Sequence, residues 1–149
     1  MQFESPAQFS WSDSFLLGFQ KMDDTHKEFV DIVARMLVAR HSELLELIDE
    51  FIRHAVIHFE EEASWMEGTS FPARQCHIDE HNAVMKSVNE VRSLVLAGNE
   101  QIGYELAKEL AAWFPAHADY LDSALAQWMV KQDFGGIPLV FKRNTRQMK

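Results

Sequence analysis

The sequence predicts an all-α protein, an antiparallel up-down-up-down four-helix bundle with an irregular N-terminal arm and a C-terminal tail. Two observations predict this fold. Apolar residues recur at helical spacing in four long segments, and only a few residues separate one segment from the next. Short connections between long helices indicate antiparallel neighbours. The chain has 149 residues, 47% of them hydrophobic, so it can bury a substantial core, and a disordered protein is excluded.

The first two helices are expected over residues 23–40 and 43–67. Asp23 or Asp24 can cap the opening turn of the first helix through a side-chain oxygen. Gly68 follows the second helix and suits the left-handed conformation at a helix C-terminus. The apolar positions that define the first helix are Phe29, Ile32, Val33, Met36 and Leu37, and those of the second are Leu44, Leu47, Ile48, Phe51 and Ala55.

The third helix is expected over residues 73–97 and the fourth over about 101–131. Gly98 and Asn99 end the third helix. Pro115 lies inside the fourth, where it removes one backbone donor, crowds the preceding turn and costs about 3 kcal/mol in a straight helix. We therefore expect a kink at Pro115. The apolar stripe of the third helix consists of Val84, Val88, Val91 and Val95.

The bundle is expected over residues 1–129, with the irregular arm over 1–20, and a basic extension over 130–149. The extension carries a net charge of +4 and leaves −13 on the rest of the chain. Either its apolar residues pack on the bundle while its basic end stays solvated, or it docks on an acidic protein partner or a membrane surface. These apolar residues are Ile137, Leu139, Val140 and Phe141.

Composition argues against several classes of protein. A net charge of −9 does not suit a nucleic-acid-binding protein, which needs a basic face. No stretch approaches about 18 uninterrupted apolar residues, so stable membrane insertion is not expected. The opening residues lack the basic and apolar regions of a signal peptide, which predicts a soluble cytoplasmic protein. The single Cys76 cannot form an intramolecular disulfide and is better explained as a packed small side chain than as a thiolate ligand.

Histidines and carboxylates occur on all four predicted helices. His58 and Glu62 are four residues apart, as are two histidines on the third helix, so each pair projects from one face of its helix toward a common point. The last pair, His117 and Asp122, is five residues apart. The two side chains would lie roughly 140° apart around a helix of about 3.6 residues per turn and would not chelate one ion comfortably. That offset suits a carboxylate that bridges two metals. The full set is His26, His58, Glu62, His77, His81, His117 and Asp122.

The number of these ligands predicts two metal ions with different coordination. If Glu62, Asp122 and one solvent-derived oxygen each bridge the two ions, the five histidines split as three and two. One ion is then six-coordinate and the other five-coordinate, with a vacancy. Imidazole and carboxylate ligands without thiolate fit iron, manganese or zinc.

Each of these residues also has an ordinary structural explanation. A lone histidine on an apolar helix face is more often a hydrogen-bonded core residue than a ligand. Seven polar residues on the inward faces of four helices, however, would cost several kcal/mol unless metals satisfied them. We therefore interpret the set as a metal site. His41 lies at a helix end and is expected in solvent, and His54, one turn before His58, either supports that ligand from behind or lies on the surface.

Longer motifs surround these residues. They are His26-Lys-Glu-Phe, His58-Phe-Glu-Glu-Glu followed by Met66, Phe71-Pro72, His77-Ile-Asp-Glu-His81, and Trp113 four residues before His117 with Asp122 beyond. The N-terminal stretch adds Phe9-Ser-Trp11 and Gly18-Phe-Gln-Lys-Met-Asp23. Over roughly residues 9–129 this pattern resembles the hemerythrin family, specifically the single-domain bacteriohemerythrins.

The resemblance implies a cofactor of two iron ions with an oxo or hydroxo bridge. It assigns the saturated iron to His77, His81 and His117, the open iron to His26 and His58, and the bridges to Glu62 and Asp122. It further implies that dioxygen is the ligand and that the protein binds it reversibly, for oxygen storage or delivery, without being an enzyme.

The chain departs from the family pattern in four places. Phe71 stands where tyrosine is usual and His54 where an aromatic residue is usual, and neither change removes a ligand. Ala118 follows His117 in place of a branched aliphatic residue, which would enlarge the ligand pocket, and Pro115 lies in the fourth helix. The expected pocket lining is Phe29, Phe59, Trp113, Phe114 and Ala118.

Two other functions are compatible with the same centre. A di-iron enzyme would reduce peroxide or nitric oxide and would turn over with a reductant. A sensor of oxygen or redox state would change how the C-terminal tail docks on a partner.

Overall fold

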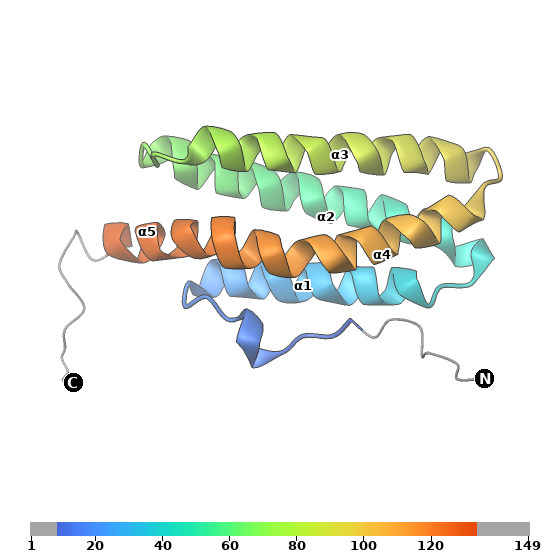
Figure 1. Cartoon of the computed structure of the whole chain (residues 1–149), viewed down its shortest axis with the longest axis horizontal. Helices are drawn as coiled ribbons and strands as arrows, with labels where there is room; N and C mark the ends of the chain where they lie inside the picture. Colours follow the sequence, from blue (N-terminus) through green and yellow to red (C-terminus); the bar gives the residue numbers. More distant parts are fainter. Residues whose placement is uncertain (1–8, 134–149) are drawn as a thin grey trace.

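The computed structural model describes residues 9–133, which form an all-α antiparallel bundle (Figure 1). Its main helices are α1 (Gln20–Leu37), α2 (His41–Gly68), α3 (Arg74–Leu96) and α4 (Glu100–His117). A five-residue π-helical segment, η2 (Ala118–Asp122), joins α4 to α5 (Ser123–Asp133). A single short 3-10 helix, η1 (Asp13–Phe15), lies in the described part of the N-terminal arm. The predicted fold class is confirmed.

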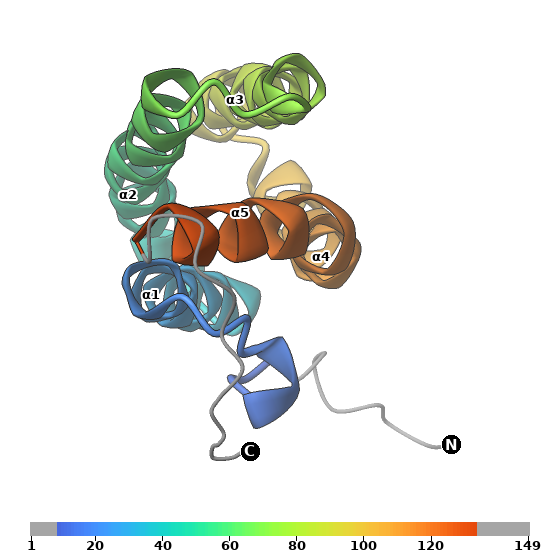
Figure 2. The same ribbon diagram turned by 90° about the vertical axis from the view of Figure 1, so that its left-hand side faces the viewer.

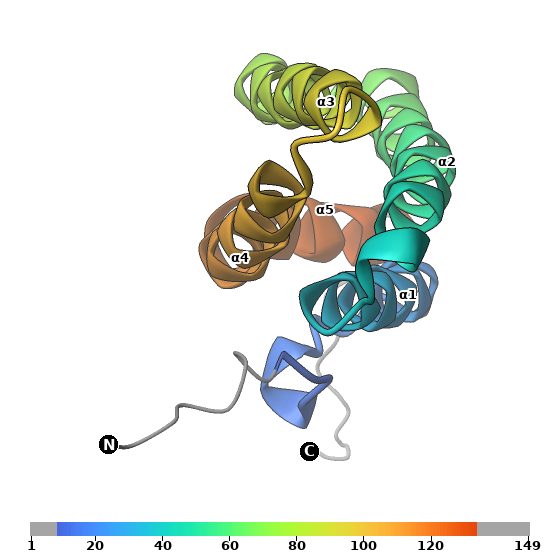
Figure 3. The same ribbon diagram turned by 90° about the vertical axis from the view of Figure 1, so that its right-hand side faces the viewer.

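The four long helices form a closed ring when viewed along the bundle (Figures 2 and 3). Helix α1 packs against α2 and α4, and α3 packs against the same two helices from the other side. Helix α5 extends past residue 129, across the predicted boundary between bundle and extension, and Figure 2 shows it turned aside from the direction of α4. That boundary stays a prediction, and the tail's apolar and basic residues beyond 133 lie outside the described residues.

Helix α1 begins three residues earlier than predicted, at Gln20. The prediction that Asp23 or Asp24 caps its first turn is wrong, because Phe19 occupies the N-cap position without a side-chain hydrogen bond. The buried Asp23 carboxylate instead accepts hydrogen bonds from the backbone N–H groups of Leu17 (2.9 Å) and Gly18 (3.2 Å). This side chain therefore fastens the irregular arm to the bundle.

The ends of α2 and α3 use different residues in the left-handed conformation. Gly68, predicted to adopt it, is still helical, and Ser70 takes it instead with a φ of 54°. Gly98 has a φ of 106° and ends α3 as predicted, because glycine has no Cβ to oppose that conformation. Asn99 then caps α4 through a side-chain bond from the backbone N–H of Ile102.

The predicted irregularity of the fourth helix lies a few residues beyond Pro115. The α-helical assignment continues through Pro115 to His117, and the widened π turn follows. In that turn the N–H of Ser123 donates to the carbonyl of Ala118, five residues earlier. The fourth segment is thus two α-helices joined by one π turn, and not a single helix over 101–131.

The apolar core is divided into two clusters along the bundle axis. The larger one contains Phe29, Phe51, Phe59, Val88 and Phe114, together with residues toward the α1–α2 and α3–α4 connections. The smaller one lies at the other end and contains Phe19, Met22, Met66, Phe71 and Leu125. On α1, on α2 and along the segment from α4 to α5, the buried histidines and carboxylates lie between residues of the two clusters. The fold therefore encloses a polar layer between two apolar ones.

Among the described residues, no helix combines the length and the apolar character that a membrane crossing requires.

Candidate metal centre

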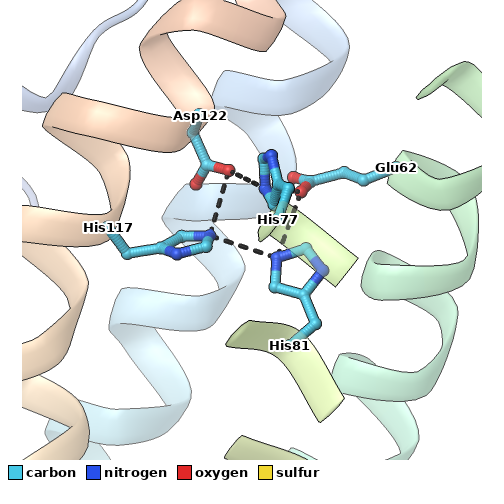
Figure 4. Close-up of side chains that lie close together, drawn as sticks. All are labelled: Glu62, His77, His81, His117 and Asp122. Atoms are coloured by element: carbon cyan, nitrogen blue, oxygen red, sulfur yellow. Dashed lines mark hydrogen bonds and ion pairs between the residues drawn. The ribbon is translucent and has the colours of Figure 1, made fainter. Parts of the chain in front are cut away.

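All seven predicted ligand residues meet in the polar layer, where each is at most 4% exposed to solvent. Every element around the ring contributes. The side chains come from α1 (His26), α2 (His58 and Glu62), α3 (His77 and His81), α4 (His117) and the last position of η2 (Asp122). Figure 4 shows five of them converging on one point. All five histidines direct their Nε2 atoms inward.

Glu62 turns its two carboxylate oxygens toward different histidines. Its Oε1 lies 3.2 Å from Nε2 of His77 and 3.5 Å from that of His81. Its Oε2 lies 2.8 Å from Nε2 of His58 and 3.8 Å from that of His26. Each oxygen of this carboxylate therefore belongs to a different group of histidines.

Asp122 divides its oxygens in the same way. Its Oδ1 lies 2.9 Å from Nε2 of His77 and 3.1 Å from Nε2 of His117, whereas its Oδ2 lies 3.0 Å from Nε2 of His26. A carboxylate with one oxygen on each side has the geometry to bridge two ions. The donor atoms of two groups accordingly lie within 4.8 Å of one another: Glu62, His77, His81, His117 and Asp122 in one, and His26, His58 and Glu62 in the other.

The prediction that His117 and Asp122 diverge around the helix is wrong. It assumed about 3.6 residues per turn, but the π turn between them brings residues five apart onto one side. Their Nε2 and Oδ1 atoms consequently lie 3.1 Å apart. The π turn thus lets Asp122 face His117 and still reach His26.

Several inward atoms have no hydrogen-bond partner within the described part of the chain. These buried atoms are Nε2 of His26, Nε2 of His77, Oε1 of Glu62 and both oxygens of Asp122. Some of these atoms lie about 3 Å from each other, yet they form no hydrogen bond of acceptable geometry. Buried polar atoms without partners cost roughly 1–3 kcal/mol each. Imidazoles and carboxylates that converge with this many buried atoms unpaired fit metal ions between them.

Aromatic side chains pack directly against the inward-facing histidine rings. Phe59 stacks on His81 with ring centres 3.8 Å apart and planes 7° apart, and Trp113 stacks on His117 at 4.2 Å and 23°. Phe114 meets His26 edge-on at 5.1 Å. Of the remaining predicted pocket residues, Phe29 meets His58 edge-on, and Ala118 is buried in the larger cluster. These five residues surround the layer with apolar surface, and their role as a ligand pocket stays a prediction.

His54 and His41 occupy different environments. The His54 side chain is only 11% exposed, its ring lies edge-on to His58 with centres 5.5 Å apart, and its Nδ1 lies 3.5 Å from Glu28. Burial is the main reason that the pKa of His54 is lowered to about 4. His54 is thus half-buried behind His58, while His41 is exposed at the start of α2, 3.4 Å from Glu100.

The sequence analysis missed Glu80. Its Oε1 accepts a hydrogen bond from Nδ1 of His117 at 2.6 Å, so a residue of α3 holds the outer edge of an α4 ring. The signal was present in the motif from His77 to His81, because Glu80 follows His77 by three residues and precedes His81 by one. Periodicity alone could not identify its partner on another helix.

Electrostatics set the protonation of the layer in the absence of metal. Burial lowers the pKa of His26, but Asp122 and Glu62 outweigh it and raise that pKa to about 9, and the same balance raises the pKa of His77 to about 9. For His81, burial prevails and lowers the pKa to about 3. Burial raises the pKa of each carboxyl, yet the neighbouring histidines hold the pKa values of both Glu62 and Asp122 well below the usual range. Two imidazolium ions thus balance two carboxylates.

Residues 17–129 match the model of the hemerythrin HHE cation binding domain. This match covers most of the chain, and the chain belongs to the hemerythrin family.

Individual relatives are similar to this chain over much of its length. A bacteriohemerythrin of Ralstonia nicotianae is 33% identical over 122 residues, which cover 82% of this chain and 89% of the relative. A bacteriohemerythrin of Stenotrophomonas maltophilia is 28% identical over 85% of this chain and 90% of its own length. A myohemerythrin of Riftia pachyptila is 28% identical over 63% and 74% of the two chains. None of these three names denotes an enzyme.

The raised pKa values predict that metal binding releases protons. At pH 7.5 the metal-free protein should hold a proton on His26 and on His77, because each pKa is about 9. A metal ion needs the neutral imidazole, so saturation with Zn²⁺ should release about two protons per chain. Calorimetric titration in buffers of different ionisation enthalpy measures that number. The number should fall as the pH rises through 9, and metal uptake without proton release at pH 7.5 would contradict this electrostatic account.

Proposed function

We propose that the polar layer holds two iron ions and that the protein binds dioxygen reversibly at one of them. One observation supports this most strongly. Glu62 and Asp122 each direct one carboxylate oxygen toward a group of three histidines and the other oxygen toward a group of two. The three histidines are His77, His81 and His117, and the two are His26 and His58. Two ions bridged by these carboxylates would then differ by one histidine, which leaves a coordination position on the two-histidine side.

The donor set supports iron as the metal. All seven donors are imidazole or carboxylate groups. The single cysteine, Cys76, is exposed on α3, so the prediction that it packs as a small side chain is wrong, and it is not among these donors. Such a set fits iron, manganese or zinc by chemistry alone, and membership of the hemerythrin family favours iron. A pair of iron(II) ions can supply two electrons to dioxygen and recover them when it leaves.

The protein's own contribution is to position the ligands and to exclude water. Phe29 and Phe114 stack on each other with centres 5.0 Å apart, and Phe114 also meets His26 on the two-histidine side. Apolar walls favour a small apolar molecule over water and keep proton donors away from bound oxygen. Release of intact dioxygen depends on that exclusion, so the aromatic lining supports storage or delivery over catalysis.

Oxygen binding is tested by a reversible optical cycle. The protein reduced without air should show no visible charge-transfer band, exposure to oxygen should produce one, and purging with argon should remove it while iron stays at two per chain. Continued consumption of oxygen, peroxide or nitric oxide with a reductant would instead support an enzyme. A spectrum that does not respond to oxygen would contradict oxygen binding.

Removal of one bridge should lower the iron content. Glu62→Ala takes away the carboxylate that faces both groups of histidines, so we expect fewer than two irons per chain and a lower melting temperature. Glu61→Ala is the matched control, because Glu61 precedes Glu62 on α2 and is exposed. His41→Ala is a second control on an exposed histidine. Metal analysis measures the iron content of each variant. An equal loss of iron in Glu62→Ala and in the two controls would refute the assignment of Glu62 as a metal ligand.

A further inference from the structure

We propose that Glu80 is the positioning residue for His117, and that it makes the three-histidine metal position the tighter of the two. The inference rests on the metal site proposed above, but not on oxygen binding. Glu80 would hold the Nδ1–H of His117 so that the Nε2 lone pair points into the layer. It would also place one extra negative charge behind that position alone.

The contact between Glu80 and His117 is short and crosses the bundle. Oε1 of Glu80 and Nδ1 of His117 are 2.6 Å apart, within the range of a charge-assisted hydrogen bond. The His117 side chain is 2% exposed and that of Glu80 is 41% exposed, so the carboxylate reaches inward from the rim of the α3–α4 interface. Helix α3 therefore supplies two inward histidines and also fixes a third from α4.

The ring of His117 needs such a partner because of its place in the backbone. It is the last α-helical residue before the π turn, so a regular helix supports it on one side only. Trp113 stacks on its face and opposes rotation about the Cβ–Cγ bond, but a stacked ring can still slide along the indole when the Cα–Cβ bond rotates. A hydrogen bond at Nδ1 lies in the plane of the ring and opposes that sliding. Glu80 and Trp113 thus constrain different motions of one ring.

Other histidines of the layer lack this support. The Nδ1 atoms of His26, His58 and His77 are buried and have no hydrogen-bond partner among the described residues. On the two-histidine side, then, neither outer nitrogen is held by a carboxylate. A carboxylate on the outer nitrogen of a ligating histidine fixes the tautomer and makes the ring a stronger donor. The two metal positions therefore differ in support as well as in number of ligands.

The alternative is that Glu80 and His117 form a plain clamp between α3 and α4. A clamp would stabilise the fold without controlling which nitrogen carries the proton. The tautomer of His117 in the metal-free protein separates the two roles. Positioning requires the proton on Nδ1, with Nε2 free to face the layer.

The experiment combines long-range ¹H–¹⁵N spectra of the histidines with Co²⁺ titrations followed by absorbance. The variants are Glu80→Ala, which removes the acceptor, and Glu80→Gln, which keeps an acceptor but removes the charge. Glu109→Gln is the matched control, since Glu109 is exposed and lines the same α3–α4 groove as Glu80. Full-length protein and a fixed pH are used throughout.

We expect wild type to show His117 with its proton on Nδ1, and Glu80→Ala to show a mixture of tautomers. One of the two Co²⁺ binding steps should weaken roughly 10- to 100-fold in Glu80→Ala, less in Glu80→Gln, and not at all in the control. A wild-type proton on Nε2 would overturn the proposal even if both variants failed to fold. Unchanged affinities in a folded Glu80→Ala would overturn it as well.

The outcome is separate from that of the oxygen test. Protein that binds two Co²⁺ ions in a Glu80-dependent way but does not respond to oxygen would refute the proposed function and leave this inference intact. Reversible oxygen binding by a protein whose metal affinity does not depend on Glu80 would refute this inference and leave the proposed function intact.

Discussion

The structure depends on one constraint: seven polar side chains are buried in a single layer between two apolar clusters. Five imidazoles and two carboxylates cannot be left unsatisfied there, because each unpaired group would cost a sizeable part of the net stability of a small domain. Without metal, protons on His26 and His77 balance Glu62 and Asp122. Two metal cations would take over that role, which links metal binding to the stability of the fold.

The helices meet this constraint by converging around the layer. Helix α2 and helix α3 each present a pair of residues four apart, which a regular α-helix places on one face. The fourth segment needs a π turn, because its histidine and aspartate are five apart. π turns of this kind occur frequently at functional sites. Here the turn gives Asp122 an oxygen for each group of histidines, so a local change in backbone determines whether the carboxylate can bridge.

Much of this arrangement follows from the sequence. Helical periodicity predicts the four long segments, and the i, i+4 spacings predict the inward pairs His58/Glu62 and His77/His81. The π turn does not follow from it, since a pattern of apolar residues cannot tell 3.6 residues per turn from a single wider turn. Pro115 marks the region but not the form of the irregularity. Glu80 is missed for another reason: its partner lies on a different helix, and such contacts leave no periodic signal.

The central claim is that the layer holds two bridged iron ions, one beside His77, His81 and His117 and the other beside His26 and His58. Anomalous X-ray diffraction at the iron edge, from crystals of the iron-loaded protein, tests this most directly. The account predicts two peaks roughly 3.5–4 Å apart, with Glu62 and Asp122 between them. A single peak within the layer, or iron bound elsewhere with the layer empty, would contradict it.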